Sequence, residues 1–336
     1  MTGSASDLGT AAGILRLGNR FCDAKALLTA VRLDLFTVLD DGPATVGELR
    51  VRLGLHGRGL ADFLALLTAL GLLRRDADGR YRNSDAAARH LVTGRPEAVC
   101  GFLHGADLNL YPVYGKLTEA LRTGRPQAEG DYLGMLRDPV ATGHFVRMMD
   151  GVTAGLGEPV LAALDGVDFG SVLDVGGCRG HLLGQVLAAR PDLRGHLFDL
   201  PQLEPFFDAY MAGTGLTGRA VFHGGDFFRD PLPPADVLIY GHVLHDWDAA
   251  QRQQLLKAAY KAIRPGGALV VYDRMLGEQP DDTENLVASL NMLLLTEGGG
   301  EYTLAELTEQ ARAAGFAAPE HRPLADFDTL AVCRKP

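Results

Sequence analysis

Hydrophobic positions in the first third of the chain recur at the spacing of α-helices. Three groups of these positions occur, at residues 14–21, 27–39 and 60–67. Thr45 and Glu48 form a capping-box pattern that opens a short helix before the third group. Gly71 ends the last helix, and two short strands follow around an Asp-Gly turn at 78–79. Helix, short helix, helix and hairpin is the order of a winged helix, which we expect over residues 1–100.

The remainder of the chain changes from helices to alternating strands and helices. Residues 101–165 are predicted to form a helical linker that contributes to a substrate pocket. Five strands follow, at 171–175, 195–200, 220–223, 235–240 and 268–272. A helix over 248–264, stopped by Pro265-Gly266-Gly267, separates the last two. This alternation predicts an α/β domain over 166–336 with a doubly wound, mainly parallel sheet. Phe327 to Arg334 is expected to return as an antiparallel edge strand.

Composition, charge and cysteine content argue against several classes of protein. The 336 residues are 47% hydrophobic and 22% charged, as in a soluble globular protein. The chain lacks an apolar run of the roughly 18–20 residues that span a bilayer, and its start lacks the features of a signal peptide. A net charge of -10 argues against general binding to nucleic acid or to anionic membranes. The four cysteines include no CxxC pair, which predicts reduced thiols in a cytoplasmic protein.

A winged helix also allows a protein of another class, a DNA-binding regulator. Residues 1–100 carry a net charge of +2, against -12 for the rest of the chain. The predicted recognition helix, from Gly57 to Leu70, is rich in leucine, and past Arg58 its only charge is Asp62. A carboxylate there would repel DNA phosphates. Packing against protein is therefore the favoured interpretation of this segment.

The strongest chemical signal is VLDVGGCRG at residues 172–180, a strand, a glycine turn and the start of a helix. Glycines let a ligand approach the backbone, and a helix N-terminus offers free N–H groups. The pattern lacks G-x-G-x-x-G, which disfavours an NAD-dependent oxidoreductase. Asp199 ends the second strand, where a carboxylate accepts both ribose hydroxyls of a nucleoside. After the third strand, Asp226 and Phe227 are candidates for contacts with adenine. The alternative is a capping Asp beside core aromatics.

A second signal, HVLHDWD at residues 242–248, follows the fourth strand. In a doubly wound sheet the carboxyl ends of the strands face the ligand crevice. His245 is therefore expected beside the cofactor, where an imidazole that titrates near neutral pH can move a proton.

Six motifs, in the order in which they occur along the chain, resemble those of one family. They are VLDVGGCRG, FDLP, GGDFF, HVLHDWD, RPGGALVVYDRML and NMLLLTEGGGEYTLAEL. The chain resembles class I S-adenosylmethionine-dependent small-molecule O-methyltransferases of the caffeic-acid and antibiotic-tailoring type. The resemblance covers nearly the whole chain. It implies a Rossmann-like methyltransferase sheet, S-adenosylmethionine as cofactor, no metal, and a homodimer formed through the winged-helix segment.

The resemblance also implies roles for individual residues. The implied cofactor contacts are Asp174, Gly176 and Gly180 for the methionine part, Asp199 for the ribose, and Asp226 and Phe227 for the adenine. Leu200, next to Asp199, is a further predicted cofactor contact. The implied catalytic group is His245 as base, flanked by the carboxylates Asp273 and Glu301. The acceptor pocket is implied to contain Met148, Met149, Asn291 and Met292, for which ordinary helix packing is an equally good interpretation.

Two residues depart from the family pattern. Cys178 replaces a glycine of the loop, and Gly241 stands where plant members often carry a lysine. The favoured function is methyl transfer to a hydroxyl of an aromatic or polycyclic small molecule. N- or C-methylation, and a relative that binds the cofactor without transferring methyl, are the alternatives within the family.

Overall fold

The structure is a computed structural model that describes residues 8–95, 97–128 and 132–336. The chain divides into two compact units, Met1–Tyr111 and Pro112–Pro336. Residues of the predicted linker 101–165 occur in both units. Among the described residues, no helix has the length and apolar character needed to cross a membrane.

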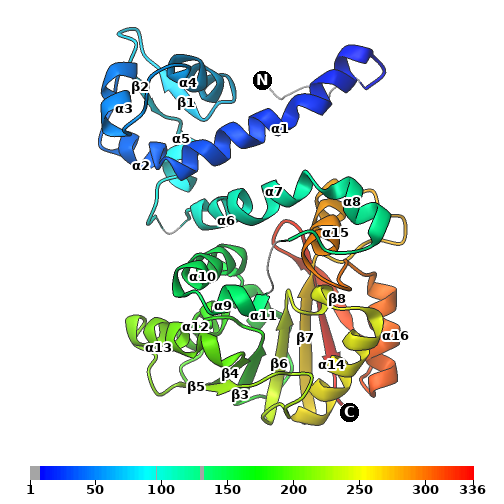
Figure 1. Ribbon diagram of the computed structural model, residues 1–336. Coiled ribbons are helices and arrows are strands. Elements are labelled where there is room, and N and C mark those ends of the chain that lie inside the picture. Colours follow the sequence, from blue (N-terminus) through cyan, green and yellow to red (C-terminus); the bar gives the residue numbers. More distant parts are fainter. Residues whose placement is uncertain (1–7, 96, 129–131) are drawn as a thin grey trace. The chain divides into compact units, whose positions relative to one another are not determined.

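The first unit is helical with one small hairpin (Figure 1). Its elements are α1 (Ala11–Arg32), α2 (Leu35–Asp40), α3 (Val46–Arg52), α4 (Leu60–Ala69), β1 (Leu73–Arg75), β2 (Tyr81–Asn83), α5 (Asp85–His90), α6 (Cys100–Gly105) and a π-helical turn at Ala106–Leu110. The predicted capping box is confirmed, because Glu48 N donates to Thr45 Oγ1 at 3.3 Å and Thr45 N to Glu48 Oε2 at 2.7 Å. The predicted hairpin is confirmed as well, with β1 and β2 paired antiparallel.

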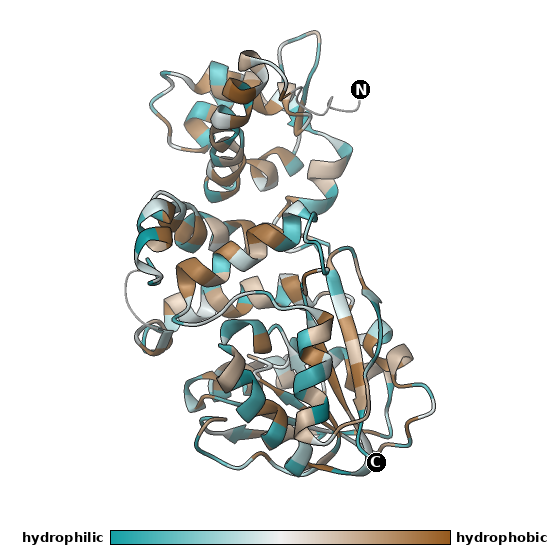
Figure 2. Cartoon of the chain, turned by 90° about the vertical axis from the view of Figure 1, so that its right-hand side faces the viewer, coloured by the Kyte–Doolittle hydropathy of each residue, from teal (hydrophilic) through white to brown (hydrophobic). Residues whose placement is uncertain are grey.

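The core of this unit is built from the buried faces of its helices. Leu35, Leu49, Leu64 and Leu67 are each fully buried in it. Figure 2 shows hydrophilic and hydrophobic bands along the same helices, as amphipathic packing requires. The apolar residues at the start of α1 are different. Ile14, Leu15, Leu17 and Phe21 are all exposed, Phe21 at 58%.

The second unit is a seven-stranded sheet with helices on both faces (Figure 1). Its helices are α7 (Tyr111–Tyr114), α8 (Leu117–Thr123), α9 (Tyr132–Leu136), α10 (Pro139–Thr153), α11 (Gly157–Ala163), α12 (His181–Ala189), α13 (Glu204–Gly213), α14 (Ala249–Ala262), α15 (Thr283–Leu295) and α16 (Leu304–Ala314). Its strands are β3 (Ser171–Val175), β4 (Arg194–Asp199), β5 (Ala220–Gly224), β6 (Ala235–Gly241), β7 (Ile263–Asp273), β8 (Glu320–Leu324) and β9 (Asp328–Arg334).

The strand order is β5-β4-β3-β6-β7-β9-β8. The first five strands in this order are parallel, which confirms the predicted doubly wound sheet. Successive residues of β3 alternate between the two faces: Val172 joins the core under α11, α12 and α13, and Leu173 the core under α14 and α16. The order reverses between β3 and β6, so the crevice at their carboxyl ends is the place for a ligand.

Two predictions at the end of the sheet are wrong. The strand Asp328–Arg334 is antiparallel to β7 as expected, but it is not the edge, because β8 pairs with its other side. β8 escapes prediction because it reads Glu-His-Arg-Pro-Leu, a polar sequence whose proline only an edge strand tolerates. The Pro265-Gly266-Gly267 stop lies within β7, where the pairing with β6 shifts register between Ala235 and Val237.

Candidate active site

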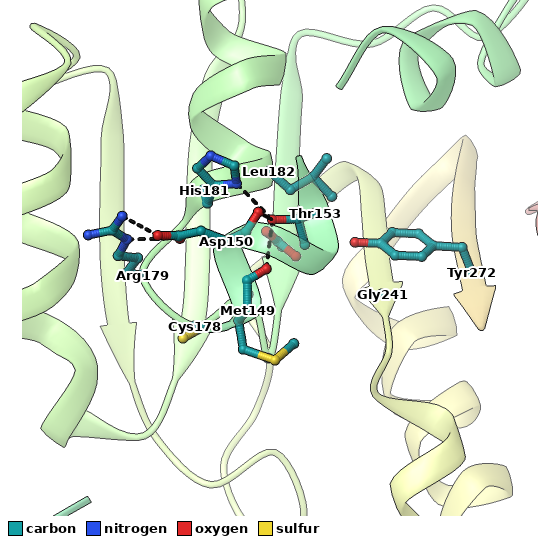
Figure 3. A pocket seen from close by; sticks show the side chains of 12 residues that line it. Met149, Asp150, Thr153, Cys178, Arg179, His181, Leu182, Gly241 and Tyr272 are labelled. Carbon is teal, nitrogen blue, oxygen red and sulfur yellow. Dashed lines mark hydrogen bonds and ion pairs between the residues drawn. The ribbon is translucent and has the colours of Figure 1, made fainter. Parts of the chain in front are cut away.

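A cavity lies at the switch between β3 and β6 (Figure 3). Its walls come from α10, from the loop after β3, from the first turn of α12 and from the ends of β6 and β7. Asp174, Gly176 and Cys178 line it on one side, and Gly241 and Tyr272 on the other. The predicted glycine loop therefore lies at the ligand crevice of the sheet.

Tight packing explains the glycines around this cavity. A Cβ at Gly177 would lie 2.3 Å from Asp174 Oδ2, and one at Gly241 would lie 2.1 Å from the ring of Tyr272. A lysine at position 241 is therefore incompatible with Tyr272 in this place. Gly176 and Gly180 have φ of +73° and +79°, which favour glycine.

Cys178 adopts the same left-handed backbone with a side chain, at φ +58°. Its N–H donates to Asp199 Oδ2 at 2.8 Å, and its buried thiol packs with Leu136, Val146 and Leu203. The hydrogen bond and the apolar contacts hold the residue in a conformation that costs roughly 1–2 kcal/mol for residues other than glycine. The loop thus tolerates the Cβ that replaces the usual glycine.

The Asp199 side chain is held by two backbone N–H groups, one from the glycine loop and one from the residue that follows Asp199. Its Oδ2 accepts from Cys178 N, and its Oδ1 accepts from Leu200 N at 2.7 Å. Each carboxylate oxygen has a further lone pair, so the side chain still has acceptors for two hydroxyls. Burial raises the pKa of Asp199 to about 7. The residue is suited to a ligand that supplies hydrogen-bond donors to a buried carboxylate.

Asp174 lies beneath the glycine loop and is almost completely buried, with 3% of its surface exposed. Burial, and then the charge of Asp199, raise its pKa to about 7. Its Oδ2 has no hydrogen-bond partner among the described residues. An unpartnered buried carboxylate oxygen, two fixed acceptors on Asp199 and a glycine-lined wall fit a cationic nucleoside such as S-adenosylmethionine.

The predicted adenine contacts have other partners in the structure. Asp226 Oδ1 accepts from Phe228 N at 2.9 Å, and Asp226 pairs with Arg229 at 3.3 Å. Phe227 packs edge-on against Phe228 and Trp247. These are the contacts of the capping alternative, and neither residue lines the cavity of Figure 3. A role for Asp226 and Phe227 at the adenine stays a prediction.

His245 lies in a 3₁₀ turn, Leu244–Asp246, directly after β6. Its Nδ1 is 2.7 Å from Glu301 Oε1 and 3.7 Å from Asp273 Oδ1. Tyr302 in turn donates its hydroxyl to Asp273 Oδ2 at 2.5 Å. The structure therefore brings together the three residues predicted as the catalytic group, although β7 and the segment before α16 supply the two carboxylates.

The carboxylates determine the charge of the histidine. Burial alone would lower the pKa of His245, but Asp273, Glu301 and Asp246 raise it to about 10. Burial raises the pKa of Asp273, and the positive charge of His245 opposes this rise. Because Nδ1 donates to Glu301, Nε2 is the ring nitrogen left for a substrate, with Asp246 Oδ1 3.7 Å away from it.

A second histidine, missed by the sequence interpretation, lies next to this cluster. The His242 ring is 5.4 Å from that of His245, and its Nε2 is 3.1 Å from Asp328 Oδ2. Ligand atoms of His242, His245 and Asp273 lie within 4.8 Å of one another, a composition that a metal ion could use. Both imidazoles already pair with carboxylates, His242 with Asp328 and His245 with Glu301. These bonds fix the orientation of both rings.

The four predicted acceptor-pocket residues occupy two helices. Met149, in α10, lines the cavity of Figure 3, and Met148 is its partly buried neighbour. Asn291, in α15, accepts a hydrogen bond from the Tyr114 hydroxyl at 2.8 Å, and Met292 is partly buried beside it. Their role toward an acceptor stays a prediction.

Asp150 and Arg179 also line the cavity, and the sequence interpretation missed both. They are 29 residues apart and form an ion pair between α10 and the loop after β3. Only Arg179 could have been found from the sequence, because it lies inside the glycine loop that is expected to face a ligand.

A doubly wound sheet with a glycine loop at the switch point and a buried carboxylate at the end of the next strand is the arrangement of a nucleoside-binding α/β protein, a class that includes the class I methyltransferases. Residues 114–317 match the family of O-methyltransferase domains, and residues 15–93 match the family of O-methyltransferase dimerisation domains. The chain belongs to this O-methyltransferase family and is an S-adenosylmethionine-dependent methyltransferase. The fold, the family and the cofactor predicted from the motifs are confirmed.

Individual relatives are similar over almost their whole length. The chain is 45% identical over 326 residues to the tetracenomycin polyketide synthesis 8-O-methyl transferase TcmO of Streptomyces glaucescens, covering 96% of both chains. It is 37% identical over 334 residues to the N,N-dimethyltransferase OxyT of Streptomyces rimosus, covering 97% of both. The structure matches human N-acetylserotonin methyltransferase in complex with S-adenosylmethionine, with a TM-score of 0.91, 27% identity and 99% coverage of both chains.

Proposed function

We propose that the protein transfers the methyl group of S-adenosylmethionine to a hydroxyl group of an aromatic or polycyclic small molecule, with His245 as general base. The observation that carries the proposal is the buried contact of His245 Nδ1 with Glu301 and Asp273 at the carboxyl end of the sheet. The similarity to TcmO, named as an 8-O-methyl transferase of polyketide synthesis, supports this class of acceptor.

The cofactor, when bound, supplies a methyl group that its sulfonium makes electrophilic. The protein has to orient the acceptor and remove the proton of its hydroxyl. A phenol has a pKa of ~10, and the carboxylates hold the pKa of His245 at about 10. Proton transfer between groups of matched pKa costs little free energy, so Nε2 of His245 is a suitable acceptor for this proton.

The carboxylates have two effects on the reaction. They accept from Nδ1–H, which fixes the ring and its tautomer, and they stabilise the imidazolium that forms. They also hold His245 protonated in the absence of substrates at neutral pH.

Nitrogen is the second candidate acceptor, because the relative OxyT is named as an N,N-dimethyltransferase. Incubation with labelled S-adenosylmethionine and a panel of phenols, amines and keto acids separates the two, with the methylated position read by mass spectrometry. We expect label on a phenolic oxygen. Label on nitrogen or carbon only, or tight cofactor binding without transfer, would contradict the proposal.

The chain is further proposed to act as a homodimer in the cytoplasm. Residues before Cys100 would form the dimer, residues 101–165 would contribute to the acceptor pocket and residues 166–336 would bind the cofactor. Exposed apolar side chains of α1 and the match to dimerisation domains support the first role. All four cysteines are free thiols, which is consistent with a reducing compartment.

A further inference from the structure

A tyrosine hydroxyl lies behind the predicted catalytic group. Tyr302 follows Glu301 directly in the segment before α16, and only 2% of its surface is exposed. Its hydroxyl donates to Asp273 Oδ2 at 2.5 Å, a length typical of an O–H donor on an ionised carboxylate. This segment therefore presents one carboxylate, that of Glu301, to His245 and holds the other with the side chain of its next residue.

The charge of Asp273 depends on this hydrogen bond. No part of Asp273 is exposed, and the bond from the Tyr302 hydroxyl is the one hydrogen bond to its carboxylate within the described part of the chain. Burial raises the pKa of Asp273, and so does the charge of Glu301, whereas His245 and the Tyr302 hydroxyl oppose the rise. A buried carboxylate that loses its donor takes up a proton more readily, because its charged form is no longer solvated.

The hydroxyl also orients the carboxylate. With Oδ2 bound to Tyr302, Oδ1 of Asp273 lies 3.7 Å from His245 Nδ1 and has no hydrogen-bond partner among the described residues. Burial lowers the pKa of His245, and among the groups that raise it the charge of Asp273 has the largest effect, ahead of Glu301. The charge state of Asp273 therefore controls how strongly His245 holds its proton.

Tyr302 is itself held in place from two sides. The buried Arg252 guanidinium lies over its ring, 4.6 Å from the centroid, and donates from Nη1 to Trp247 O at 2.8 Å. The backbone oxygen of Tyr302 accepts from Leu276 N at 2.8 Å, which joins this segment to the residues that follow Asp273. A cation over the face of a phenol ring makes the hydroxyl a stronger donor, because it stabilises negative charge on the oxygen.

We propose that Tyr302 is a positioning residue of the active site, whose hydroxyl keeps the Asp273 carboxylate ionised and directs it at His245. Tyr302 acts through Asp273 on the proton affinity of the base, without contact with the substrate. The inference rests on the proposed role of His245 as general base, but the effect that it assigns to Tyr302 can be measured without an acceptor.

The test is the titration of His245 in Tyr302→Phe, a variant that keeps the ring and removes the hydroxyl alone. It leaves in place the other titratable groups that face His245 and Asp273, which are Glu301, Asp246, and His242 with its partner Asp328. NMR of protein with histidine labelled at Cε1 follows the titration, and His245→Gln identifies the signal. Loss of the hydrogen bond should lower the proton affinity of His245 about tenfold, which moves the midpoint by about one pH unit.

Activity provides the second measurement. The pH profile of kcat/KM for a phenolic acceptor should move toward acid by the same amount, about one unit, because the neutral form of His245 accepts the proton. Affinity for S-adenosylhomocysteine should stay within about twofold of the wild type, since Tyr302 acts on the base and not on the cofactor.

Two further variants separate positioning from packing. Tyr240→Phe removes another buried tyrosine hydroxyl of the same core, one that donates to Leu255 O at 3.1 Å, and it should leave the titration of His245 unchanged. Asp273→Asn removes the charge through which Tyr302 acts. Adding Tyr302→Phe to Asp273→Asn should therefore give no further shift, as expected for two residues that act as one unit.

An unmoved titration of His245 in Tyr302→Phe would overturn the proposal. A shift of equal size in Tyr240→Phe, or a further shift in the double variant, would overturn it as well. If Tyr302→Phe does not fold and the double variant does, the loss traces to the unpartnered carboxylate and supports the proposal. If neither folds, Tyr302 is a structural residue and the proposal is wrong. Wild-type turnover in His245→Gln, beside a shifted titration in Tyr302→Phe, would contradict the proposed base and still support the role of Tyr302 toward His245.

Discussion

Replacing Glu301 by glutamine should shift the pH dependence of turnover toward acid by about one unit. Glu301 Oε1 accepts from His245 Nδ1 at 2.7 Å, and both side chains are buried. Glutamine keeps the size and an acceptor oxygen but removes the charge. A hydrogen bond to a charged group contributes about 1.5–3 kcal/mol and a neutral one about 0.5–1.5 kcal/mol, so the change costs roughly 1–1.5 kcal/mol. One pKa unit corresponds to ~1.36 kcal/mol, which gives the size of the shift.

The assay is the pH profile of kcat/KM for a phenolic acceptor. The neutral form of His245 accepts the proton, so the wild-type profile should rise with pH through the pKa of about 10. The Glu301→Gln profile should rise about one unit lower and reach a plateau roughly tenfold lower, because the imidazolium is less stabilised. Glu309→Gln, an exposed change in α16, should behave as the wild type does. An unmoved profile for Glu301→Gln would refute the reasoning.

The remaining predictions concern the cofactor, its pH dependence and the dimer. Asp199→Ala should weaken S-adenosylhomocysteine by roughly 1.5–3 kcal/mol for each lost hydroxyl contact, and wild-type affinity by calorimetry would exclude the ribose role. Because ribose hydroxyls donate to the ionised form of Asp199, whose pKa burial raises to about 7, wild-type affinity should rise with pH up to about 7 and then level off. A flat profile would show that Asp199 does not titrate there. Phe21→Asp, on the exposed face of α1, should reduce the mass measured by light scattering from dimer to monomer, whereas a monomeric wild type would contradict the proposed dimer.

The sheet and the cofactor loop could be predicted because they depend on local sequence. A parallel strand buried on both faces reads as an apolar run, and Ser171–Val175 is buried at every position. The glycine loop follows it directly, and Asp199 ends the next strand. His245 could be placed by its position after the fourth strand. Asp273 and Glu301 were placed by resemblance, since nothing in their spacing requires them to meet His245.

Other features depend on tertiary contacts that the sequence pattern does not contain. Arg179 and Asp150 pair only because α10 packs beside the loop, and the one signal in the sequence was the place of Arg179 in the glycine loop. β8 forms because β9 presents a free edge to it, and its own polar sequence gave no indication. The Asp226 carboxylate suits a cap and a ligand equally well in sequence, and only the structure shows that it accepts from Phe228 N in the turn after β5.

The account's central claim is that His245 removes the proton of an acceptor hydroxyl. Turnover of a phenol by His245→Ala tests it most directly, with cofactor affinity measured on the same sample and His321→Ala, an exposed change in β8, as the control. At neutral pH kcat should fall on the order of 10²–10⁴, with affinity for S-adenosylhomocysteine within about twofold of the wild type. Activity should then recover as the pH approaches that of phenol ionisation, ~10. Turnover equal to that of the wild type at neutral pH would show that His245 is not the base.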